Sequence, residues 1–116
     1  MTGSTLNRHI EVFFGEIGEA LGPTGHLDGL GIRTKGMGAG ILRAIEMIRT
    51  SKPSGSELGC MVLLRIHEGD VQIAVTTWTR EKPNADVVRG PDTLFPLSTM
   101  PEIIAGFMVS RFPDLP

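Results

Sequence analysis

A β-hairpin across Leu58–Arg80 is the feature that most constrains the fold of this chain. Apolar residues alternate along both arms, and Glu68-Gly69 between the arms has the length of a two-residue hairpin turn. This turn pairs Ile66 with Val71 and places every apolar pair on one face, whereas a slip by one residue would mix the two faces. The residues predicted to face a core are Cys60, Val62, Leu64, Ile66, Val71, Ile73 and Val75.

The opposite face of the hairpin mixes large apolar side chains with polar ones. Met61 and Leu63 form its middle and Trp78 extends it, and such a centre with a polar rim is typical of protein interfaces. The same residues would be ordinary core if helices covered both faces of the sheet, and the sequence leaves both interpretations open. The predicted partner-binding residues are Met61, Leu63, Arg65, Gln72, Thr76, Trp78 and Arg80.

Three helices are predicted around the hairpin. Apolar residues at 3.6-residue spacing indicate a helix over residues 5–21 and a second over residues 39–50. A third helix is expected after Thr99, because Thr99 and Glu102 have the spacing of a capping box and Pro101 suits a first helical turn.

Two short strands complete the prediction. Asp86–Arg89 is expected to pair with the second arm of the hairpin, and Leu30–Thr34 allows a fourth strand. The predicted fold class is α+β in two layers, with three helices on a small antiparallel sheet of three or four strands, in the order α-(loop)-α-β-β-β-α. A chain of 116 residues supports one hydrophobic core, so residues 1–116 are expected to form a single domain.

The glycine-rich stretch before the expected second helix offers an alternative site. Backbone N–H groups at a helix N-terminus bind anions, and nearby basic side chains add charge. The stretch lacks the spacing of a dinucleotide fingerprint and the Gly-Lys-Ser/Thr of a Walker loop. The residues predicted for this small-ligand or phosphate site are Arg33, Lys35, Gly36, Gly38 and Gly40.

Composition argues against several other function classes. A net charge of −2 disfavours nucleic acid and anionic membranes as partners, and no apolar run is long enough for a signal or a membrane span. The histidines His9, His26 and His67 lack metal-ligand spacing, so no metal or cofactor is predicted. Cys60 is expected to be buried and inert.

These observations favour a non-enzymatic protein over an enzyme, although a catalytic site assembled only in three dimensions would leave no motif. We expect a small cytoplasmic protein-interaction module, a homodimer, that binds a partner protein and inhibits or escorts it. The alternative is a small-ligand or phosphate-binding domain that uses residues 33–40.

Overall fold

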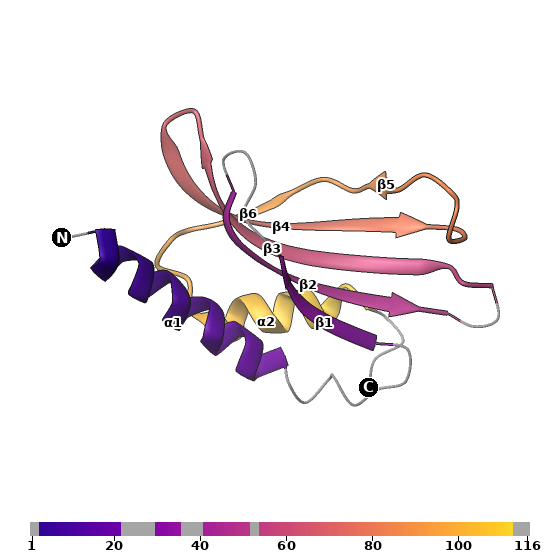
Figure 1. Cartoon of the computed structure of the whole chain (residues 1–116), viewed down its shortest axis with the longest axis horizontal. Coiled ribbons are helices and arrows are strands. Elements are labelled where there is room, and N and C mark those ends of the chain that lie inside the picture. The colour runs from indigo at the N-terminus through magenta and orange to yellow at the C-terminus, as the bar shows by residue number, and fades with distance from the viewer. Residues whose placement is uncertain (1–2, 22–29, 36–40, 52–53, 113–116) are drawn as a thin grey trace.

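The computed structural model describes residues 3–21, 30–35, 41–51 and 54–112, with the backbone alone for 3–7 and 30–35. In these residues the fold is α+β: six antiparallel strands form one sheet, and both helices lie on the same side of it (Figure 1). The elements in chain order are α1 Gly3–Leu21, β1 Leu30–Lys35, β2 Ile41–Thr50, β3 Glu57–His67, β4 Asp70–Arg80, β5 Val88–Arg89, β6 Thr93–Phe95 and α2 Pro101–Ser110.

The hairpin of β3 and β4 has the predicted register. Ile66 pairs with Val71, and His67 closes the hairpin opposite Asp70. Glu68 and Gly69 form the turn with φ values of 51° and 83°. Positive φ at both turn residues matches the right-handed twist of the two strands, which is why so short a turn can join them.

The predicted second helix is wrong, because Ile41–Thr50 forms strand β2. β2 lies between β1 and β3 and pairs with a strand along each of its edges. Ala44 and Ile45 are both buried although they belong to opposite faces of the strand, since Ala44 pairs with Leu63 and Ile45 with Val62. A strand buried on both sides carries apolar residues in succession, and such a run also fits helical spacing.

The edges of the sheet differ from each other. β1 occupies one edge and confirms the strand expected near Leu30–Thr34. β4 pairs with both β5 and β6 along its outer edge. The expected third strand is thus present as the two residues of β5, whereas β6 lies where we predicted no strand.

The core lies between the sheet and the two helices. α1 and α2 contact each other, and they pack on β2 and β3 respectively. α2 begins as expected at Pro101, but its N-cap residue is Met100 and no side chain caps the helix. The capping box predicted from Thr99 and Glu102 is therefore not formed. The buried core residues are Phe14, Ile17, Leu21, Ile45, Met47, Cys60, Val62, Leu64, Ile73, Val75, Ile104, Ala105, Met108 and Phe112.

Two residues predicted to be core are exposed at the tip of the hairpin. Ile66 is 50% exposed and Val71 is 42% exposed, although both share the face of the buried Leu64 and Ile73. The hairpin tip curves away from the layer of helices (Figure 1). Strand alternation correctly gave the face of these two residues, but the reach of the helices decides whether that face is covered.

Candidate functional site

The face of the sheet opposite the two helices, here called the helix-free face, carries a cluster centred on Trp78. The indole N–H donates a hydrogen bond to Glu46 Oε2 at 2.8 Å, reaching from β4 to β2. The Trp78 side chain crosses β3 at Gly59, where an added Cβ would lie 2.0 Å from the indole ring. Glycine at position 59 therefore lets the ring lie against the backbone, and the buried carboxylate of Glu46 accepts a strong, charge-assisted bond.

The apolar residues predicted to bind a partner lie on this helix-free face. Met61, Leu63 and Trp78 are 9%, 5% and 8% exposed, and Thr76 is buried beside them. Met61 and Leu63 pack with Ala44 and Ala74, both of which are small and buried. No described helix covers this face, yet these residues offer little exposed area.

The polar residues of the predicted site are already engaged within the chain. Arg65 donates a hydrogen bond to Gln72 at 3.3 Å and forms an ion pair with Asp92 at 2.8 Å. The guanidinium of Arg80 lies 5.5 Å from the centre of the Trp78 ring and 3.3 Å from a Glu57 oxygen. The predicted rim thus fastens the strands and the loop after β5 to one another.

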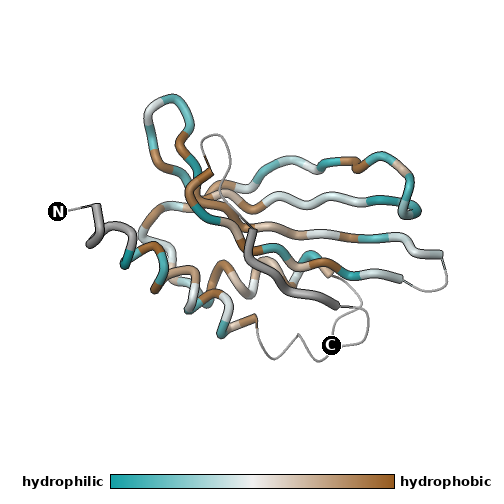
Figure 2. Tube along the Cα trace, in the orientation of Figure 1, coloured by the Kyte–Doolittle hydropathy of each residue, from teal (hydrophilic) through white to brown (hydrophobic). Residues whose placement is uncertain are grey.

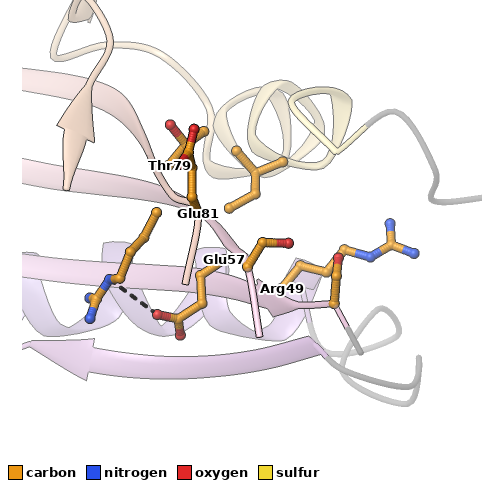
Figure 3. Close-up of a pocket in the computed structure, with 8 residues that line it drawn as sticks. Arg49, Glu57, Thr79 and Glu81 are labelled. Atoms are coloured by element: carbon orange, nitrogen blue, oxygen red, sulfur yellow. Dashed lines mark ion pairs between the residues drawn. The ribbon is translucent and has the colours of Figure 1, made fainter. Parts of the chain in front are cut away.

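A hollow of about 320 Å³ lies beside these residues at the open end of β2, β3 and β4 (Figure 3). The close-up shows the ion pair of Glu57 as a dashed line, with Arg49 extending away from it. Arg49, Arg80, Glu57 and Glu81 all line the hollow, so two cations face two anions. This balance of charges gives the hollow no preference for an anionic or a cationic ligand.

Large apolar side chains are exposed in another place, around the hairpin tip, α1 and the start of α2. We call this surface the apolar band. Its members are between 42% and 59% exposed. The central strands are most hydrophobic in the half of the sheet nearest the hairpin tip, whereas their other ends are pale or hydrophilic (Figure 2). The apolar band consists of Val12, Ile66, Val71, Leu97, Met100 and Ile103.

Two adjoining hollows give the apolar band its shape. One, of about 460 Å³, lies between α1 and the hairpin and is lined almost wholly by apolar residues, among them Ile10 and Val71. The other, of about 440 Å³, lies between α1 and the loop before α2, with Val12 and Met100 in its wall. Phe13, Leu97 and His9 line both hollows.

The residues of the alternative ligand site are only partly described. Arg33 and Lys35 belong to β1, where their backbone positions pair with Glu46 and Ala44. Gly36, Gly38 and Gly40 lie outside the described residues. The element that follows is strand β2, so the helix N-terminus on which the anion-binding argument depended is not present.

The buried thiol of Cys60 is poorly suited to nucleophilic chemistry. Burial raises its pKa from 9.0 to about 12, although the nearby charge of Arg111 lowers it in part. The thiolate, which is the reactive form, is therefore scarce at neutral pH. Within the described ranges no three His, Cys, Asp or Glu side chains are grouped as metal ligands would be. Neither described helix has the length and hydrophobicity that a bilayer crossing requires.

Comparison with known proteins finds no protein-family model that matches the chain, no similar curated protein and no similar solved structure.

Proposed function

We propose that this chain is a small protein-interaction module that binds a partner protein through the apolar band and thereby inhibits or escorts it. The observation that carries the proposal is the exposure of large apolar side chains in the walls of two adjoining hollows, namely Val12, Val71, Leu97 and Met100, with the exposed Ile66 and Ile103 on the hairpin tip and the first turn of α2. A large exposed apolar surface commonly marks an interaction site. Its contact with water is unfavourable, and binding of a partner removes that surface from water.

The surroundings of the apolar band have the composition of an interface. Phe13 and Leu97 provide an aromatic and an aliphatic wall at its centre, and the polar side chains of Arg8 and Glu16 stand at its margin. Protein interfaces combine a desolvated apolar centre with a polar rim, and a few central residues supply most of the binding energy. The predicted homodimer stays a separate prediction, which this surface does not require.

The test compares partner capture by three forms of the chain. Val71→Glu combined with Leu97→Glu places charges on both walls of the larger hollow, at positions exposed enough to tolerate them. Val88→Glu is the matched control, because Val88 is a 66% exposed apolar residue of β5 outside the apolar band. Each form is first checked for unchanged circular dichroism and thermal stability, and is then used as bait in an extract of the source cells.

A partner is accepted only if it also binds in purified form. We expect one protein that the wild type and Val88→Glu retain and that the double variant binds at least about tenfold more weakly, as loss of a central apolar contact implies. Its activity or solubility should change when the wild type is added. Equal retention by all three folded forms would overturn the proposal.

A further inference from the structure

The charges around the apolar band are mostly negative. Three exposed carboxylates stand beside it: Glu16 on α1, Glu68 in the hairpin turn, and Glu102 in the first turn of α2. The basic side chains nearby are fewer. Arg8 is the exposed arginine in the wall of the smaller hollow, and Arg43 is held 3.0 Å from Glu11 in an ion pair.

We propose that the occupant of the apolar band is a basic amphipathic segment of the partner, with large apolar side chains flanked by lysine or arginine. This inference rests on the proposed function and adds the chemistry of the partner. The apolar side chains would fill the hollows, while flanking cations would lie opposite the carboxylates of the rim. Such charge complementarity raises the association rate and excludes acidic competitors.

The two hollows indicate at least two apolar anchors on the same side of the segment. Phe13 and Leu97 line both hollows, so the hollows adjoin and one short segment can fill both. Residues three or four positions apart on a helix point to the same side, and this is how amphipathic helices fill apolar grooves. A helix with apolar residues at that spacing is therefore the form to test.

The same charges disfavour two other occupants. In a symmetric dimer each surface meets its own copy, so both partners would bring the same acidic rim to the interface. An anionic lipid surface would be repelled by the same groups, and the basic residues that usually attract such a surface are too few here. A basic segment of another protein satisfies both the apolar centre and the acidic rim.

The experiment measures binding of two synthetic helical peptides to the full chain by fluorescence anisotropy. Both peptides carry leucines on one face, and the remaining positions are lysine in one peptide and glutamate in the other. We expect the lysine peptide to bind at least about tenfold more tightly at low salt, with the preference shrinking as salt screens the rim. Val71→Glu with Leu97→Glu should weaken binding of the lysine peptide, whereas Val88→Glu should not.

A charge-reversal pair tests the rim itself. Glu16→Lys with Glu68→Lys should remove or invert the preference between the peptides. Glu81→Lys with Asp86→Lys changes the net charge equally at exposed positions outside the band and should leave the preference in place. An equal response of the two double variants would show that net charge alone acts, and would overturn the inference.

The remaining outcomes also decide the matter. Equal affinity for both peptides, or no binding of either, overturns the inference. So does a dimer in light scattering that Val71→Glu with Leu97→Glu dissociates, or binding to anionic vesicles that the same variant abolishes. A purified partner that is lost in this variant while the peptides show no charge preference would leave the proposed function standing and remove only the inference about partner chemistry.

Discussion

At the scale of single residues, the clearest interdependence joins Trp78, Gly59 and Glu46. The indole can reach Glu46 on β2 only because position 59 of β3 has no side chain in its path. The sequence shows a glycine within a strong strand, which often marks a close approach of another group. It does not show which group approaches, since that depends on the register of three strands at once.

Gly59→Ala should therefore be strongly destabilising. The new Cβ would lie 2.0 Å from the Trp78 ring, so the ring must move and its hydrogen bond to Glu46 must lengthen or break. We expect a loss of about 2–4 kcal/mol in the free energy of unfolding, measured with urea, together with a red shift of tryptophan emission. Gly15→Ala is the control, because a Cβ there meets no atom within 4 Å and should stabilise α1 by up to about 1 kcal/mol.

Cys60 should make stability depend on pH in the alkaline range. Its pKa is about 12 in the folded protein and 9.0 when the thiol is unperturbed, so the folded state holds the proton more tightly. This contribution is complete below pH 9 and is lost as pH rises from about 9 to about 12. In urea unfolding at about pH 8 and about pH 10.5, the wild type should lose about 2 kcal/mol more than Cys60→Ala. Identical pH dependence of the two proteins would contradict the assignment.

At the scale of elements, the hairpin was predictable and β2 was not. The hairpin register follows from a two-residue turn and from alternation that is clean on one face, and both are local properties of the sequence. β2 lacks such alternation because Ala44 and Glu46 pack on one face while Ile45 and Met47 pack on the other. Which interpretation is right depends on the strands at its two sides, and those pairings are not local.

The sequence also could not predict how far along the hairpin the core-facing residues are buried. Val75 and Val71 lie on the same face of β4, but Val75 is 2% exposed and Val71 is 42% exposed. We expect Val75→Thr to cost about 1–3 kcal/mol, because it buries a hydroxyl in the core. Val71→Thr should cost less than about 0.5 kcal/mol. Urea unfolding measures both, and equal losses would show that the hairpin tip is covered in solution.

At the scale of the whole molecule, the residues of the apolar band are far more exposed than the apolar residues that the sequence indicated as an interface. Met61, Leu63 and Trp78 have interface composition, but each of them is less than a tenth exposed. The apolar band is assembled from four separate parts of the chain: α1, β3, β4 and residues 97–103. Within each part, its residues form no pattern that marks them as part of a surface. Only the packing of α1 beside the hairpin tip and the start of α2 brings them together.

The apolar band should account for most of the binding of a neutral hydrophobic dye. Val71→Ser with Leu97→Ser removes two of its exposed side chains, so the fluorescence of bound Nile red should fall severalfold. Val88→Ser should leave the signal nearly unchanged, because that residue is exposed apart from the two hollows. Equal signals from all three proteins would place the main exposed apolar surface elsewhere.

The unequal edges of the sheet limit how copies of this chain can associate through their backbones. β5 and β6 close the outer edge of β4 in short pieces, and Pro91 between them cannot donate to a further strand. Among the described strands, β1 is left as the edge with a longer unpaired side. Pairing of β1 with β1 of a second copy would join the two sheets edge to edge. The joined sheet would then have no free edge of comparable length. Among the described strands, growth by backbone pairing at this edge would therefore stop at two copies.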